Sequence, residues 1–405
     1  PAPRHYPRAA HASAALTLAL PALALAQTDV TLTGADDVEF AGDESFQNLF
    51  MFDQSRASLI DVRFFGDVET NDNAYLRVDM PASSGSNLVD GWFRAKGSSV
   101  IDLVSVDSAG GFRLSMQDDA TVNILPGGVA NTWSPVSVGD RSTLIAHSGY
   151  FSSGIGVGGQ GRLEYAGSYA PGISIGGQAT AHLLGGSSLS VVVGGSAQLE
   201  FTGGHTEFLD TFGDSRTTVS GGHIDVVRHQ AATPLRVTGG DIDVFDLFPD
   251  AHAIIEGGTV DFLASNARDS ATLSGGDIGS LVLFDQASMI VEVLDLMIDH
   301  DDNDATPAQS LLNPDGTFVL GHDDALFDEI WGSNSDFSVT PEFEVVWKDG
   351  SVDVFDVVRA DVPSNSYSTG GDAWTGSLTF RLVPAPSGLA LFGGLLTLRR
   401  RRRVG

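Results

Sequence analysis

The fold is decided by a repeat, residues 221–274, which reads GGHIDVVRHQAATPLRVT, GGDIDVFDLFPDAHAIIE, GGTVDFLASNARDSATLS. Each unit begins with a glycine pair, and pairs recur every 18 residues from Gly185 to Gly275. Further pairs start halfway between these, at Gly158, Gly176 and Gly194. A fixed period of this length is typical of repeat architectures whose units stack on one another.

Each unit holds two short runs with the alternation of a β-strand. In the first run, apolar positions four and six alternate with polar residues, which predicts a strand with one buried face. These pairs are Ile224/Val226, Ile242/Val244 and Val260/Phe262. The second run offers one apolar position per unit: Val219, Val237, Ile255 and Leu273. A single unit cannot bury its own apolar face, so the units are expected to stack.

The predicted fold class is all-β, a parallel β-solenoid of about 18-residue coils with a C-terminal β cap. Glycine suits the corners of the coils because they need positive φ. We expect the regular coils over residues 149–292. Residues 27–148 hold short strand-like runs and are interpreted as a less regular β-rich segment of the same solenoid. Residues 293–382 are acidic and β-rich without the glycine grid, and are interpreted as the cap.

Residues 18 apart lie above one another in such a stack, so outward positions form columns. Position five of the unit gives the carboxylate column Glu207, Asp225, Asp243 and Asp261. Position three gives His205, His223, Asp241, Thr259 and Asp277. Three interpretations of the carboxylates stay open: a solvated acidic face, a site for a divalent cation such as Ca²⁺, or an acid pair of the kind that hydrolyses glycosides. His205 and His223 are expected to stack as a surface ladder rather than to form a zinc site.

The N-terminal end has the features of an export signal. Residues 1–26 contain Arg4 and Arg8 ahead of an apolar run, and no acidic side chain. The run ends in small residues at Ala24 and Ala26. This order predicts a secretory signal peptide that is cut between Ala26 and Gln27.

The C-terminal end, residues 383–405, combines three features in a fixed order. Val383 is followed by Pro384-Ala385-Pro386, then by a short apolar stretch, and then by the arginine cluster Arg399, Arg400, Arg401, Arg402 and Arg403. The apolar stretch is shorter than the roughly 20 residues that a spanning helix needs. Arginines at its end are retained on the cytoplasmic side of a membrane.

This tail resembles the PEP-CTERM sorting tails of Gram-negative secreted proteins, with Ala385 where that family usually has Glu. The glycine-pair units are similar to the SGG-type repeats of surface proteins with such tails. The resemblance implies Sec-dependent export and transient inner-membrane insertion through the tail. It also implies processing by an exosortase-type sorting enzyme and a final place outside the cell or at its surface.

Composition excludes several function classes. The 52 acidic and 22 basic side chains give a formal net charge of −30, which would repel a nucleic acid. Absence of cysteine removes disulfides, thiolate metal sites and cysteine nucleophiles. Neither a phosphate-binding Walker loop nor an H-E-x-x-H zinc motif is present. Gly213-Asp214-Ser215 is interpreted as a turn rather than as a hydrolase nucleophile block.

These observations predict an exported structural or adhesive protein of the cell envelope or extracellular matrix. No catalytic activity is expected, and no cofactor other than a possible Ca²⁺. Extracellular polysaccharide is a candidate partner. The alternatives are a carbohydrate-active β-helix enzyme that uses acids of the Glu207–Asp261 column, and a cation-dependent binding module.

Overall fold

The structure is a computed structural model of the chain. It describes residues 4–5, 16–17, 29–42, 45–64, 66–80, 91–106, 113–126, 131–132, 135–265, 268–283, 286–299, 306–307, 316–321, 342–359 and 377–383. Its secondary structure there is β-strand and turn, without a helix. Within these ranges no helical segment has the length and apolarity needed to cross a membrane.

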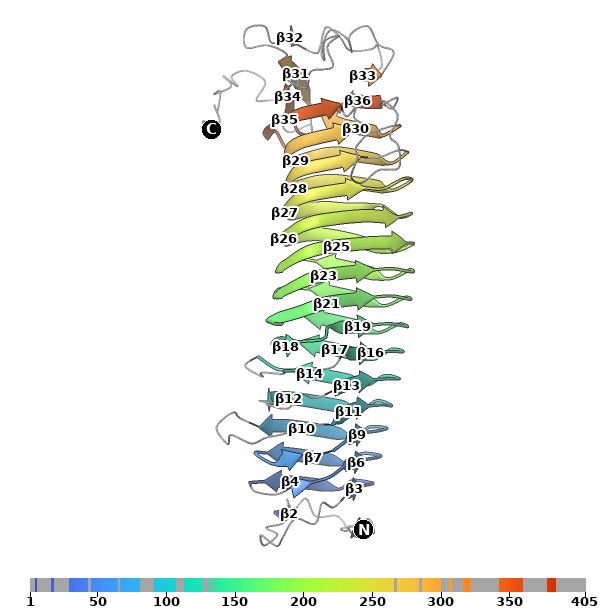
Figure 1. Cartoon of the computed structure of the whole chain (residues 1–405), viewed down its shortest axis with the longest axis vertical. Helices are drawn as coiled ribbons and strands as arrows, with labels where there is room; N and C mark the ends of the chain where they lie inside the picture. Colours follow the sequence, from blue (N-terminus) through green and yellow to red (C-terminus); the bar gives the residue numbers. More distant parts are fainter. Residues whose placement is uncertain are drawn as a thin grey trace. The chain divides into compact units, whose positions relative to one another are not determined.

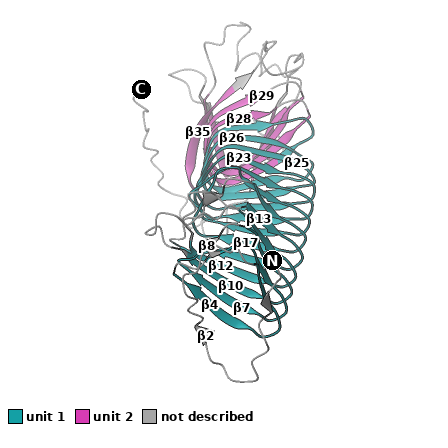
Figure 2. Cartoon of the chain, turned by 60° about the horizontal axis from the view of Figure 1, so that its bottom comes forward, with its two compact units in different colours: residues 1–252 teal, residues 253–405 magenta. Residues whose placement is uncertain are grey.

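The chain divides into two compact units, residues 1–252 and 253–405 (Figure 2). The strands of the first unit are β1 (Arg4–His5), β2 (Leu16–Thr17), β3 (Val30–Leu32), β4 (Asp37–Ala41), β5 (Ser45–Phe46), β6 (Leu49–Met51), β7 (Arg56–Ile60), β8 (Arg63–Phe64), β9 (Val68–Thr70), β10 (Tyr75–Met80), β11 (Trp92–Ala95), β12 (Val100–Val106), β13 (Arg113–Met116), β14 (Thr121–Ile124), β15 (Asn131–Thr132), β16 (Val136–Val138), β17 (Thr143–Ala146), β18 (Tyr150–Phe151), β19 (Ile155–Val157), β20 (Arg162–Tyr165), β21 (Tyr169–Ile175), β22 (Thr180–Leu183), β23 (Ser187–Val193), β24 (Gln198–Phe201), β25 (His205–Gly213), β26 (Arg216–Ala231) and β27 (Leu235–Leu247).

The second unit holds the remaining strands. They are β28 (His252–Ser265), which starts one residue before the division, β29 (Ser270–Leu283), β30 (Ser288–Val293), β31 (Asp295–Asp299), β32 (Thr306–Pro307), β33 (Thr317–Gly321), β34 (Glu342–Val346), β35 (Val352–Arg359) and β36 (Ser377–Leu382).

Strands of the first unit pair in parallel with the equivalent strands of the next coil, so the predicted parallel β-solenoid is confirmed (Figure 1). From β20 to β27 the register advances by 18 residues per coil; Arg162 pairs with Thr180, and Thr180 with Gln198. Earlier coils are longer and less regular. Arg56 pairs with Tyr75, 19 residues on, and Tyr75 pairs with Val100, 25 residues on.

The predicted role of glycine at the corners is also confirmed. In the pair that opens a unit, the second glycine has positive φ, as at Gly186 (+81°) and Gly222 (+81°). In the pairs that lie half a period away, the second glycine also has positive φ, as at Gly159 (+62°) and Gly177 (+67°). A left-handed residue at each corner turns the chain without the steric cost that a side chain would add.

The buried face of the first run differs from the sequence prediction at one position. Position four is buried as expected, at Ile224, Ile242 and Val260. Position six was predicted to be buried and is not: Val226 and Val244 are half-buried, and Phe262 is 37% exposed. Position seven is buried instead, at Val227, Phe245 and Leu263.

The physical reason is a bend after position four, where two consecutive side chains face outward. The alternation resumes one residue later, so positions seven and nine take the inward face that a straight strand would give to six and eight. Strict period two holds for a straight strand, whereas a coil has to turn. The second run follows the prediction, because Val219, Val237, Ile255 and Leu273 are fully buried.

Pairing in the second unit is mixed. Within that unit, β29 pairs in parallel with both β30 and β35, and β30 pairs in parallel with β36. Pairing is antiparallel between β31 and β34, β34 and β35, and β33 and β36. Strands from residues 317–382 therefore cover the edges of β29 and β30, as a C-terminal β cap does.

Candidate functional site

Two outward columns of the first unit lie side by side on β25, β26 and β27. Position three contributes His205, His223 and Asp241; position five contributes Glu207, Asp225 and Asp243. The strand register places each member one coil from the next, since His205 pairs with His223 and His223 with Asp241. All six side chains are at least partly exposed.

Both columns face outward because of the local backbone. Position four, between them, points inward and is fully buried, as at Thr206, Ile224 and Ile242. Residues two apart on a strand share a face, so positions three and five of one coil are neighbours there. Position five is also a diagonal neighbour of position three in the adjacent coil, within reach of long side chains.

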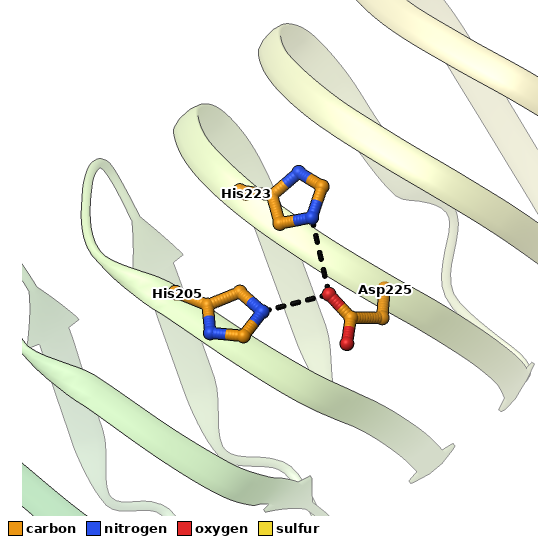
Figure 3. Close-up of side chains that lie close together, drawn as sticks. All are labelled: His205, His223 and Asp225. Atoms are coloured by element: carbon orange, nitrogen blue, oxygen red, sulfur yellow. Dashed lines mark hydrogen bonds and ion pairs between the residues drawn. The ribbon is translucent and has the colours of Figure 1, made fainter.

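Asp225 is the centre of the best-defined cluster. Its Oδ1 atom lies 2.7 Å from Nε2 of His205 and 3.1 Å from Nε2 of His223. The two imidazole rings stack, with centroids 5.2 Å apart and planes inclined by 21°. Figure 3 shows both rings directing a nitrogen at the same carboxylate oxygen. We call His205, His223 and Asp225 the His–Asp cluster.

His223 also faces the carboxylates of the following coil. Its Nδ1 atom lies 3.2 Å from Oδ2 of Asp241, and its Nε2 atom lies 3.7 Å from Oδ2 of Asp243. The ring is therefore surrounded by three carboxylates from two coils. Within the described residues, two groupings could hold a metal ion: the His–Asp cluster, and His223 with Asp241 and Asp243.

Histidine side chains lie beside two acids of the predicted carboxylate column, Asp225 and Asp243. The prediction that His205 and His223 stack on the surface is confirmed. Neither metal-ligand grouping in the described part of the chain includes Glu207 or Asp261. Glu207 is half-buried on β25, and Asp261 is exposed on β28 in the second unit.

The diagonal contact between the columns was not anticipated from the sequence, although its signal is present. Successive units begin with the triplets His205-Thr-Glu, His223-Ile-Asp and Asp241-Ile-Asp after the glycine pair. A histidine in one unit and an acid two positions later in the next is the pattern of a diagonal pair across parallel strands.

Other residues singled out in the sequence have a simpler placement. Ser215 is 1% exposed and follows Gly213, which has φ of +69°, so this segment is a turn with a buried serine. Val383 ends β36's segment, where its N–H donates to the carbonyl oxygen of Val293 at 2.9 Å. The processing residues Ala26, Gln27, Pro384, Ala385 and Pro386, and the cluster Arg399–Arg403, lie outside the described residues.

Comparisons of the chain with protein-family models, with curated proteins and with solved structures found no match.

Proposed function

We propose that the chain is an exported, surface-sorted protein with a structural or adhesive role in the cell envelope or extracellular matrix. The observation that carries this proposal is the 18-residue register that recurs from β20 to β27, with a single local shift at Ser220 in the pairing of β26 with β27. It gives the first unit a backbone in which each coil is hydrogen-bonded to the next along its strands. Such a stack holds repeated surface columns at fixed spacing, which suits a scaffold or spacer.

The net negative charge of the chain argues against a role in binding nucleic acid and is compatible with a role outside the cytoplasm. The acidic excess gives the molecule a surface that stays soluble and attracts cations. The ends of the chain support export and sorting, because an apolar run before Gln27 and an arginine-terminated tail after Val383 bracket the acidic part. An exosortase-type enzyme and the Sec machinery are the partners that these ends imply.

The sorting half of the proposal is tested by mass spectrometry and cell fractionation of the protein in its native host. We expect an N-terminus at Gln27, a C-terminus near Pro384, and protein in the surface or extracellular fraction. Replacement of Arg399–Arg403 by glutamine should trap the protein with its tail attached. Arg381→Gln, which changes an arginine outside the cluster, is the matched control and should be sorted normally.

Retention of Arg399–Arg403 in mature protein that stays in the inner membrane would contradict sorting.

The structural half of the proposal is tested by incubating purified protein with a panel of polysaccharides. Binding without release of new reducing ends is expected. Sustained turnover that Asp225→Asn or Asp243→Asn abolishes would replace the structural role with an enzymatic one.

A further inference from the structure

The His–Asp cluster carries an inference beyond the structural role. We infer that His205, His223 and Asp225 bind one divalent first-row transition metal ion, for which Zn²⁺ is the best fit, on the outward face of β25 and β26. The positions of the donor atoms, the carboxylates that surround His223 and the chemical type of the donors support this assignment.

The donor atoms already converge. Nε2 of His205, Nε2 of His223 and Oδ1 of Asp225 come from neighbouring coils, and the donor atoms of the three residues lie within 4.8 Å of one another. Zinc bonds to nitrogen and carboxylate oxygen are about 2.0–2.2 Å long, so two donors on a tetrahedral ion lie about 3.3 Å apart. The observed separations of 2.7 and 3.1 Å would have to open by about 0.6 and 0.2 Å to reach this value.

The surroundings of the His223 ring are the second observation. A neutral imidazole has one N–H and one lone pair, whereas a carboxylate only accepts hydrogen bonds. Both ring nitrogens of His223 face carboxylates: Nδ1 faces Asp241, and Nε2 faces Asp225 and Asp243. Three carboxylates around one imidazole give this position a strongly negative potential, which attracts a cation to the side of the ring where Nε2 faces Asp225.

Asp241 has the position of a supporting carboxylate. A metal-bound histidine usually donates its other N–H to a carboxylate or carbonyl, which fixes the tautomer. Nδ1 of His223 lies 3.2 Å from Oδ2 of Asp241, so this nitrogen can donate while Nε2 keeps its lone pair for the metal. Asp241 is thus a positioning residue for His223. We assign no second metal ion to the grouping of His223 with Asp241 and Asp243.

The donor set selects the class of metal. Ca²⁺ and Mg²⁺ prefer six or more oxygen ligands, whereas imidazole nitrogen suits zinc, copper and nickel. Two imidazoles and one carboxylate give three protein ligands and leave a fourth tetrahedral position for water or for a group of a partner. The parallel register places His205 and His223 on adjacent coils, one beside the other in the folded chain.

The test is isothermal titration of the untagged full chain with Zn²⁺ alone at pH 7.5, in a buffer that does not bind metals. We expect one Zn²⁺ per chain from this site. Asp225→Asn and His223→Gln should each weaken it at least about tenfold, and Asp241→Asn should weaken it less. His182→Gln is the matched control, because His182 on β22 faces one carboxylate, that of Glu200 at 3.9 Å, and should bind as the parent does.

Substitution with Co²⁺ adds a spectroscopic readout of the coordination geometry at the site. Visible absorption of tetrahedral intensity is expected for the parent and for His182→Gln, and is expected to be lost in His223→Gln. Circular dichroism of each metal-free variant checks that it is folded. The inference is overturned if Zn²⁺ binding is absent, if it is unchanged in folded His223→Gln and Asp225→Asn, or if Ca²⁺ competes for the site at equal concentration.

Discussion

The carboxylate of Asp140 accepts a hydrogen bond from the backbone N–H of Asp118, one coil earlier, at 3.1 Å. Both residues have left-handed φ, +59° for Asp118 and +51° for Asp140. The same contact joins Gly97 to Asp118, at 3.1 Å. Aspartate therefore occupies this corner in several early coils, Gly34 and Gly97 occupy it in others, and glycine takes it from Gly159 to Gly213. Each corner aspartate adds a hydrogen bond between coils.

Substitution at Asp140 should separate the two contributions of this corner. Asp140→Asn keeps an acceptor and a residue that tolerates left-handed φ, so it should change the free energy of unfolding by less than about 0.5 kcal/mol. Asp140→Gly keeps only the conformation and should cost about 1 kcal/mol. Asp140→Ala loses both and should cost about 2 kcal/mol. Urea unfolding measures all three, and equal stability of the Asn and Ala variants would contradict the account.

Gly185 and Gly186, the pair that opens one repeat unit, should respond very differently to substitution by alanine. A Cβ on Gly186, with φ of +81°, would lie 1.8 Å from the carbonyl oxygen of Gly167, whereas a Cβ on Gly185 would meet nothing within 4 Å. Gly186→Ala should therefore lose more than about 2 kcal/mol of stability. Gly185→Ala should be neutral or gain about 0.5 kcal/mol, because it restricts the unfolded chain. Thermal unfolding of the two variants measures both effects. Similar losses of stability in the two variants would show that a steric clash at Gly186 does not determine the choice of glycine there.

Buried His229 makes stability depend on acid pH. It is 1% exposed; the hydroxyl of Thr211 lies 2.6 Å from its Nδ1, and its Nε2–H donates to the carbonyl oxygen of His252 at 2.9 Å. Burial lowers the pKa of His229 to about 4 from the usual 6.5. The unfolded chain therefore binds this proton more readily, and stability is lost as pH falls from 6.5 to 4, by roughly 3 kcal/mol.

The measurement for His229 is the slope of unfolding free energy against pH. His229→Gln cannot titrate, so the variant should lose less stability than the parent between pH 6.5 and 4, whatever its stability at pH 7. His147→Gln, a change at an exposed histidine, serves as the control. Parallel curves for parent and His229→Gln would count against a neutral buried imidazole.

Asp353 in the second unit has the opposite dependence. It is 8% exposed and accepts the backbone N–H of Ile278 at 2.9 Å. Burial, together with the nearby Asp277 carboxyl, raises the pKa of Asp353 to about 6. A raised pKa means that its contribution is complete below about pH 4 and is lost as pH rises through 6, by up to roughly 3 kcal/mol.

Asp277→Asn tests this relationship, because it removes the like charge beside Asp353 and leaves the buried carboxyl in place. The variant should be more stable than the parent at pH 7, by about 1 kcal/mol, and similar to it at pH 4. Asp214→Asn changes an exposed acid of the first unit and is the control for loss of one surface charge. A variant that is no more stable than the parent at pH 7 would contradict the coupling.

Part of this protein is determined by its sequence alone. The glycine pairs set the period, because corners with positive φ exclude most side chains, and position four is buried wherever that period holds. The outward columns follow from the same period. Only the tertiary structure decided the rest, because it depends on where the backbone bends and on contacts between coils. The bend after position four moves the buried face from Val226 to Val227. Asp225 meets His223 of its own strand and, diagonally, His205 of the preceding coil rather than another acid.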